Sequence, residues 1–340
     1  MSILGKILGL EKNVFGLDIG YENIKVVELR KTGSMFKLVS FGCSPSPKEP
    51  FAKEKIKDKK ALANAIVQAV SNHHISAKSV VSALPESLVF TKIIQLPKMR
   101  MEELQSVVPN EAANFIPLEP TQTYLDFQVV GEANNNYEVL VVAAPKTLVN
   151  DFIETLKMAG LSPFCLETKP LANTRALIPK NAQEAVLILD LGALATSLTI
   201  YDNGAIKFTV TFPLGGQIFT EKIAATLSIK MEEAEEKKKT LGLTKAGEQI
   251  KKGLEEPLGI LIDEIASGLN YYKKHDEKAK ISKIILTGGG AAMPGLCSFL
   301  ENKIGIKTEV GNPWQAIKNP PKERQTVIFT AAIGMAMRQE

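Results

Sequence analysis

Short apolar runs and helically spaced apolar positions alternate along most of the chain. The segments "VFGLDIG", "NIKVVELR" and "FKLVSFG" within 14–42 predict three strands joined by tight turns. Apolar residues recur at helical spacing over 59–73, and "KSVVSAL" at 78–84 predicts a buried strand. Strands that alternate with helices indicate an α/β fold.

The stretch 88–167 shows the same alternation on a smaller scale. It contains a strand, "LVFTKIIQL", and a helix, "MRMEELQSVVPNEAANF", which we expect to be interrupted or kinked near Pro109. A hairpin around "GEANNN", a helix that ends at Gly160 and a last strand, "LSPFCLET", complete the order β-α-β-β-α-β. We therefore predict a compact inserted unit with one sheet and two helices.

The second half of the chain returns to the pattern of the first. "AVLILDL" and "LATSLTIYDNGAIKFTVTFPLGG" predict strands, with a hairpin turn at Asp202-Asn203-Gly204. A highly charged helical part covers 217–278, and the strand "KIILTGG", a helix at 294–304 and the apolar helix "TVIFTAAIGMAMR" follow.

An aspartate lies at the end of an apolar strand twice, about half the chain apart. Asp18-Ile19-Gly20 and Asp190-Leu191-Gly192 each precede a short turn and a second strand, which implies two similar domains. A charge inside an apolar strand needs a partner or a metal ion. Turns of this kind offer backbone N–H groups to phosphate, and two carboxylates beside a polyphosphate fit a hydrated Mg²⁺. The alternative is that each aspartate only fixes its own turn.

Two glycine-rich turns add to this pattern. Gly288-Gly289-Gly290 follows a strand, and Gly215-Gly216 precedes a helix, so both permit a close approach of a ligand to the backbone. The Gly288–Gly290 turn is not a dinucleotide-binding fingerprint, because Met293 occupies the position where that motif has its third glycine. The pair Gly5-Lys6 is followed by Ile7, which excludes a P-loop.

The composition is that of a globular protein of more than one domain. Hydrophobic residues make up 45% and charged residues 23% of 340 residues, and the net charge of +4 gives no reason to infer nucleic-acid binding. The three cysteines are scattered, which disfavours both a disulfide framework and a zinc site. Without a signal peptide or an apolar run of about 18 residues, we expect a cytoplasmic protein with no transmembrane segment.

Taken together, the two hairpins and the glycine turns resemble the actin, Hsp70 and hexokinase superfamily. Within it, the chain resembles the PilM family of type IV pilus assembly proteins, relatives of the cell-division protein FtsA. The segments that carry this resemblance are "QLPKMRMEEL", "NEAANFIPLE", the "PLA" of 170–172, "AEEKKKTLG", "NPWQAI" and "FTAAIGMAMR".

The resemblance implies an α/β, actin-like (ribonuclease H-like) bilobed fold with an inserted subdomain as in FtsA and PilM. The expected first lobe comprises 1–87 and 325–340, and the insert comprises 88–167. The second lobe would comprise 168–216 and 280–324, with a helical, charged subdomain at 217–279.

The resemblance also implies ATP and Mg²⁺ as cofactors. Asp18 and Asp190 would hold Mg²⁺ through water. The residues expected to contact the phosphates are Gly20, Tyr21, Glu22, Asn23, Lys25, Gly192, Ala193 and Thr196. Those expected near the ribose and adenine are Gly215, Gly216, Glu235, Lys238, Gly288, Gly289 and Gly290. Glu235 and Lys238 also fit a solvated helix face.

One position departs from the superfamily. Lys169 stands where actin-like ATPases such as Hsp70 carry a glutamate that orients the attacking water, and a charged lysine cannot accept a proton. Glu167 is the nearest substitute, and it would serve only after a shift. We therefore predict ATP binding with slow or absent turnover.

The resemblance implies a cytoplasmic ATP-binding scaffold of the pilus assembly machinery. It would bind the cytoplasmic N-terminal peptide of a PilN-like inner-membrane protein, contact other pilus assembly proteins and lie peripheral to the inner membrane through its partner. Apolar residues from 88–130 would line the peptide groove. The alternatives are an FtsA-like filament-forming protein, although no linker with a membrane-binding helix follows "FTAAIGMAMR", and a kinase of the same superfamily, for which no sugar-binding set is found.

Overall fold

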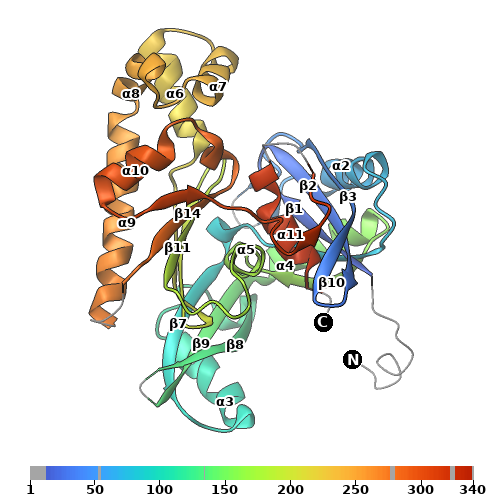
Figure 1. The fold of residues 1–340 in the computed structure, drawn as a ribbon. Helices are drawn as coiled ribbons and strands as arrows, with labels where there is room; N and C mark the ends of the chain where they lie inside the picture. Colours follow the sequence, from blue (N-terminus) through green and yellow to red (C-terminus); the bar gives the residue numbers. More distant parts are fainter. Residues whose placement is uncertain (1–12, 53–54, 134, 276–279, 322–325, 339–340) are drawn as a thin grey trace. The chain divides into compact units, whose positions relative to one another are not determined.

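The computed structural model describes residues 13–52, 55–133, 135–275, 280–321 and 326–338. The chain divides into two compact units (Figure 1). Unit 1 comprises Met1–Leu88, Lys146–Ile178 and Asn312–Glu340, and unit 2 comprises Val89–Pro145 and Pro179–Gly311.

Unit 1 is built on a six-stranded sheet with helices packed against it. In sheet order the strands are β10 (Ser162–Glu167), β6 (Ser79–Ala83), β1 (Val14–Ile19), β2 (Asn23–Thr32), β3 (Met35–Pro45) and β16 (Ile317–Lys318). The helices are α2 (Lys59–Asn72), α4 (Lys146–Met158), α5 (Lys169–Leu177) and α11 (Thr330–Ala336), and β4 (Phe51–Ala52) and β5 (Lys55–Ile56) form a small hairpin.

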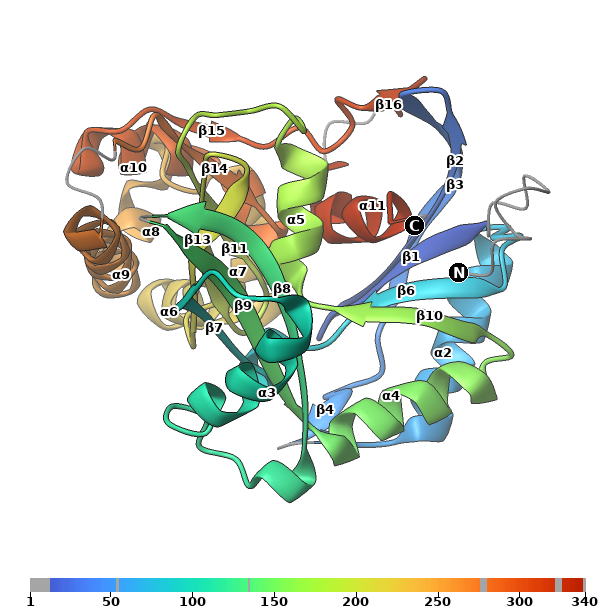
Figure 2. The same cartoon turned by 90° about the horizontal axis from the view of Figure 1, so that it is seen from below.

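The core of unit 1 fixes the position of α5. Helices α5 and α11 lie side by side (Figures 1 and 2), and α11 also packs on β1. Val14 on β1, Ala172 on α5 and Met335 on α11 share one buried apolar cluster. Small residues in this cluster allow the close helix packing, so the first residue of α5 is held by a rigid core.

Unit 2 contains a five-stranded and a three-stranded sheet. The first has the order β13 (Ala205–Phe212), β12 (Thr196–Asp202), β11 (Val186–Leu191), β14 (Lys283–Thr287) and β15 (Thr308–Val310), and the second β7 (Phe90–Pro97), β9 (Asn136–Pro145) and β8 (Thr123–Ala133). Its helices are α3 (Met101–Ala112), α6 (Gly216–Leu227), α7 (Met231–Thr240), α8 (Glu248–Gly253), α9 (Glu255–His275) and α10 (Leu296–Ile304).

The two large sheets have the same topology, as the repeated Asp-x-Gly pattern predicts. In each, an antiparallel meander (β1-β2-β3 or β11-β12-β13) is extended beyond its first strand by a parallel strand (β6 or β14). A further parallel strand follows, β10 next to β6 and β15 next to β14. The duplication therefore extends over five strands of each sheet.

The prediction that 88–167 forms one inserted unit is wrong for its last helix, α4, and its last strand, β10, which belong to unit 1. Strand β10 pairs in parallel with β6 of the large sheet, and α4 packs against α2. The three-stranded sheet contains only β7, β9 and β8, with α3 on it (Figure 1). The local pattern gives a strand at β10 but cannot say which sheet it joins, because that pairing depends on distant residues. Helix α3 also continues past Pro109 to Ala112.

Two boundaries of the predicted second lobe differ for the same reason. Helix α5, expected there as part of 168–216, packs on α11 in unit 1. Strand β16, expected there as part of 280–324, pairs with β3. Both are short elements whose place is set by tertiary contacts with unit 1.

Candidate functional site

The hairpin of β1 and β2 places Asp18 opposite Lys25, inside the large sheet of unit 1. Asp18 is 3% exposed. Lys25 Nζ lies 3.2 Å from Oδ2 of the carboxylate, and Lys169 Nζ, from the first residue of α5, lies 2.9 Å from Oδ1. A buried carboxylate is thus shared by two ammonium groups.

This arrangement determines the charge of Asp18. Burial alone raises the pKa of its carboxyl, but the charges of Lys169 and Lys25 and their hydrogen bonds outweigh burial and hold the pKa well below its usual range. Asp18 is therefore ionised at every physiological pH. The partner that a charge in an apolar strand requires is a pair of lysines from this chain.

The turn after Asp18 is closed by its own backbone and by Ser46, the residue that follows β3. The N–H of Gly20 donates to the carbonyl of Asn23 at 2.9 Å, and a Cβ at Gly20 would lie 2.9 Å from that same oxygen. Ser46 donates from its hydroxyl to Gly20 O at 2.6 Å and from its N–H to Glu22 O at 2.9 Å. Tyr21 packs edge-on against Phe51.

The second hairpin, β11–β12, reproduces this turn in unit 2. Gly192 N–H donates to Ala195 O at 3.0 Å, and a Cβ at Gly192 would lie 2.8 Å from that oxygen. The residue opposite Asp190 is Ser197, so the lysine of the first hairpin has no counterpart at this register. The two turns share their backbone geometry but differ in charge.

Unit 2 brings the Gly215–Gly216 turn onto this second hairpin. The first N–H groups of α6, from Gly216 and Gln217, donate to the carbonyls of Gly192 and Ala193 at 2.8 and 2.9 Å. The buried Thr196 hydroxyl donates to Leu214 O at 2.5 Å, which ties β12 to the same turn. Thr196 therefore stabilises the connection between the β11–β12 hairpin and the turn before α6.

Glu235 and Lys238, on α7, lie at the start of α6. The buried Lys238 Nζ donates to Gly216 O at 2.8 Å and to the Thr220 hydroxyl at 2.7 Å, and it pairs with Glu235 at 2.6 Å. Burial raises the pKa of Glu235, but hydrogen bonds from Lys238 and Thr220 and the charge of Lys238 lower it to about 2. The pair therefore connects α7 to the start of α6, and Lys238 is a buried residue that does not lie on a solvated helix face.

The Gly288–Gly290 loop covers Asp190. Gly288 has φ 79°, and a Cβ there would lie 2.4 Å from Oδ1 of Asp190 and 2.6 Å from the carbonyl of Leu191. A Cβ at Gly290 would lie 2.8 Å from Leu191 Cβ, whereas Gly289 has open space around it. Only glycine fits at Gly288, because a side chain would collide with the carboxylate.

The predicted site residues therefore fall into two groups. Unit 2 gathers its predicted residues around the second hairpin. Unit 1 gathers Asp18, the turn after it, Lys25 and Lys169 around the first.

The two aspartates differ in their fit to a metal ion. Both oxygens of Asp18 already face ammonium groups, so this carboxylate does not fit a Mg²⁺ ligand. Asp190 is half-buried next to a glycine loop, and a carboxylate is a ligand type that Mg²⁺ takes. Within the described ranges, no group of three or more His, Cys, Asp or Glu side chains forms a metal cluster.

Glu167 is a structural ion-pair residue in this structure, not an available base. Arg175 contacts both its oxygens at 2.8 Å, and Arg338 lies 2.6 Å from Oε2. The side chain is 1% exposed. A general base needs a free lone pair, and two guanidinium groups engage this carboxylate. Its candidacy as a catalytic residue is therefore corrected.

Sequence reasoning missed several residues in and around the predicted site. Ser46 bonds to the first turn, Ser197 lies opposite Asp190, Thr220 contacts Gly216, Glu235 and Lys238, and Arg175 and Arg338 bind Glu167. None of them belongs to a motif. The register of β11 with β12 is the one signal from which Ser197 follows, because it occupies the position of Lys25 in the first hairpin.

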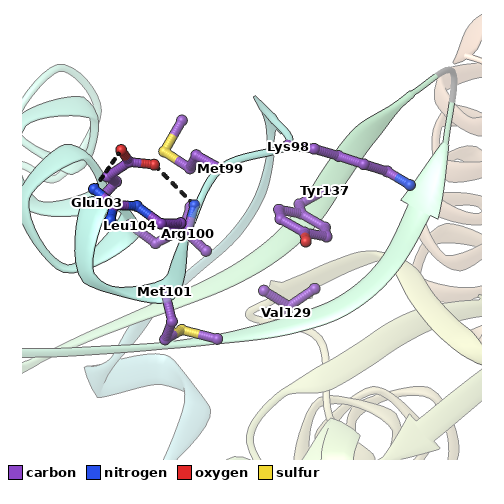
Figure 3. A pocket seen from close by; sticks show the side chains of 8 residues that line it. All are labelled: Lys98, Met99, Arg100, Met101, Glu103, Leu104, Val129 and Tyr137. Atoms are coloured by element: carbon purple, nitrogen blue, oxygen red, sulfur yellow. Dashed lines mark hydrogen bonds and ion pairs between the residues drawn. The ribbon is translucent and has the colours of Figure 1, made fainter.

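An open pocket lies on the three-stranded sheet and α3 of unit 2 (Figure 3). Its lining combines apolar and basic side chains: Lys98, Met99, Arg100, Met101, Glu103, Leu104, Val129 and Tyr137. Met101 is 53% exposed, and Lys98 lies over the ring of Tyr137 at 5.9 Å from its centroid. Arg100 forms an ion pair with Glu103 (Figure 3), and the two charged groups are 3.2 Å apart.

No helix in the described part of the chain has the length and apolar character that a membrane span requires.

Comparison with known proteins identifies the family. The cell-division protein FtsA of Bacillus subtilis is 25% identical over 350 residues, which cover 87% of this chain and 78% of that protein. MreB5 of Spiroplasma citri bound to AMPPNP has a TM-score of 0.55 at 14% identity and covers 96% of this chain and 95% of that one, which shows the fold alone.

A chain from a structure described as the PilM–PilN type IV pilus biogenesis complex is more similar. It has a TM-score of 0.84 at 28% identity, with 96% of this chain and 98% of that chain covered. These likenesses confirm the predicted actin-like α/β fold class. The family model described as "Type IV pilus assembly protein PilM" matches residues 16–340, so this chain belongs to the PilM family.

Proposed function

We propose that this chain is an ATP-binding scaffold of the type IV pilus assembly machinery. It binds the N-terminal peptide of a PilN-like inner-membrane protein and lies at the cytoplasmic face of that membrane through this partner. The observation that carries the proposal is the match to the PilM family over 16–340, together with the likeness to the chain from the PilM–PilN complex.

Nucleotide binding is supported by the geometry of unit 2. Two N–H groups of α6 bond to the hairpin that carries Asp190, and the absence of a side chain at Gly288 lets the backbone of that loop lie close to the Asp190 carboxylate. The nucleotide-bound MreB5 has the same fold. When bound, Mg²⁺ would offset phosphate charge beside Asp190, and Gly192, Gly288 and Gly289 would admit the nucleotide to the backbone.

Slow or absent turnover is supported by unit 1. Lys169 is committed to Asp18, and Glu167 is committed to two arginines. Neither side chain offers a free proton acceptor, so water near a bound γ-phosphate lacks a general base from this region.

Peptide binding is supported by the pocket on α3. All of its lining residues except Tyr137 come from 88–130, the segment in which the sequence predicts an apolar groove, and they include the exposed Met101. Lys98 and Arg100 are paired with Glu132 and Glu103, so this lining suits an extended peptide with apolar side chains.

Calorimetric titration tests the proposal. The full chain, saturated with ATP, is titrated with a synthetic peptide from the cytoplasmic N-terminus of the PilN-like protein of the same organism. We expect saturable one-to-one binding, and no binding of a scrambled peptide of the same composition. If the native and scrambled peptides behave alike, the scaffold function is wrong.

A further inference from the structure

Three basic residues lie side by side on neighbouring strands of the large sheet in unit 1. Arg30 on β2 is directly opposite Lys37 on β3, and Lys318 on β16 is directly opposite the same lysine. All three residues are exposed. The N–H of Phe36 donates to the carbonyl of Ala316 at 3.0 Å, which holds β16 in this register. Strand pairing thus joins distant segments into a row of three cations, which we call the basic row.

The basic row lies on the face of the sheet away from α11. Its neighbours along the three strands, Leu29, Phe36 and Ile317, pack in one apolar cluster with residues of α11, which lies against the other face (Figure 2). Because successive side chains of a strand point to opposite faces, the basic row points away from this cluster. Helix α2 covers the same face farther along the strands, where the Ser40 hydroxyl donates to the carbonyl of His73.

The basic row costs stability unless an anion lies against it, because like charges directly opposite each other on neighbouring strands repel. Among the residues that the structure describes, no carboxylate forms an ion pair with Arg30, Lys37 or Lys318. Neighbouring strands lie about 4.8 Å apart, so the three Cα atoms span about 10 Å. An exposed lysine is a hydrated point charge on a flexible stem, which suits many anions in a surface better than one shaped site. An extended anionic surface therefore fits the basic row.

We propose that the basic row docks unit 1 onto the anionic headgroups of a lipid membrane. The choice of a membrane rests on the proposed function, which brings the chain to the cytoplasmic face of the inner membrane through a peptide partner. Such a leaflet is negatively charged, and each lysine or arginine near it strengthens binding by about fivefold. Three cations alone give a weak contact, but tethering through a partner raises the effective concentration of the surface and makes a weak contact sufficient.

Flotation of the full chain with lipid vesicles tests the docking surface in the absence of the peptide. The vesicles contain phosphatidylglycerol and phosphatidylcholine, or phosphatidylcholine alone, in a buffer of low salt, because salt screens exposed charges. We expect the native chain to bind the anionic vesicles and not the neutral ones. The triple variant Arg30→Gln, Lys37→Gln, Lys318→Gln should bind the anionic vesicles more weakly by about thirtyfold or more.

The matched control removes three positive charges elsewhere on the surface. It combines Lys245→Gln, Lys251→Gln and Lys252→Gln, at three exposed lysines of unit 2, and should bind the anionic vesicles within about threefold of the native chain. If the variant of the basic row does not fold, Lys37→Gln alone replaces it and should weaken binding by about fivefold.

Two results of the flotation experiment overturn the inference. One is that the native chain does not bind anionic vesicles, and the other is that both triple variants lose binding equally, because binding would then follow net charge alone. Binding to poly-glutamate that depends on the basic row, without binding to vesicles, also overturns it in favour of an acidic protein partner. Peptide binding without vesicle binding overturns only the docking surface, whereas vesicle binding without peptide binding overturns only the proposed scaffold function.

Discussion

Lys169 Nζ lies 2.9 Å from Oδ1 of Asp18, so the first residue of α5 neutralises a carboxylate at the end of β1. This contact joins two sequence features that otherwise look independent: an aspartate inside an apolar strand, and a lysine in the place of a water-orienting glutamate. Lys169 replaces the glutamate that would act as a base, and it also forms an ion pair with Asp18, the predicted metal ligand. With this arrangement, the charged Lys169 cannot act as a general base.

Asp18→Asn should destabilise unit 1 at neutral pH. The change leaves two ordered lysines without their anion, and we expect a loss of about 2–3 kcal/mol, because both lysines can partly return to water. Thermal unfolding followed by circular dichroism measures the effect. Asp126→Asn, at an exposed carboxylate on β8, is the matched control and should change stability by less than about 0.5 kcal/mol.

The effect of Asp18 should depend on pH. The pKa of Asp18 is lower in the folded chain than in the unfolded chain, so its contribution is full above the unfolded value of about 4 and decreases as the pH falls toward the folded value. The stability difference between the native chain and Asp18→Asn should therefore be constant from pH 7 to pH 5 and shrink below pH 4. A difference that grows on acidification would contradict the ion pair.

The fold was largely predictable from local patterns, because the two Asp-x-Gly hairpins are repeated and fix both sheets. The Asp18–Lys169 contact could not be predicted, although the sequence marks Asp18 as a candidate metal ligand and Lys169 as a departure from the superfamily. It depends on the position of α5, which follows from apolar packing of α11 on α5 and β1, and such long-range contacts leave no periodic signal. The same limit applies to β10, whose pairing with β6 removed it from the predicted insert.

Lys238→Ala should destabilise unit 2 far more than the neighbouring change Lys239→Ala. Lys238 is buried and contacts Gly216 O, Thr220 and Glu235, whereas Lys239 has a side chain that is 62% exposed and pairs only with Glu235 in the described contacts. We expect a loss of about 2–3 kcal/mol for Lys238→Ala, and less than about 0.5 kcal/mol for Lys239→Ala. Urea denaturation compares the two variants. Equal losses would mean that the tie between α7 and α6 is not formed.

Glu167→Gln separates a structural from a catalytic role of this residue. Removal of the charge leaves Arg175 and Arg338 without their shared partner, so stability should fall by about 3 kcal/mol. Phosphate release, measured below the unfolding temperature, should stay at the native level. Lost phosphate release with unchanged stability would restore Glu167 as a catalytic residue.

Met101→Asp should weaken binding of the PilN-like peptide by about tenfold or more. The new carboxylate enters an apolar part of the pocket and removes an exposed contact residue (Figure 3). Met158→Asp, at a methionine on α4 that is 44% exposed, is the control and should bind the peptide within twofold of the native chain. Unchanged binding to Met101→Asp would place the peptide on another surface.

The most direct measurement follows the fate of bound ATP. The full chain is loaded with radiolabelled ATP in Mg²⁺, separated from free nucleotide, and sampled over time for intact ATP and released phosphate. We expect ATP to be retained at up to one equivalent and recovered intact over many minutes. Recovery of no nucleotide, or rapid conversion of the bound ATP to ADP and free phosphate, would contradict it.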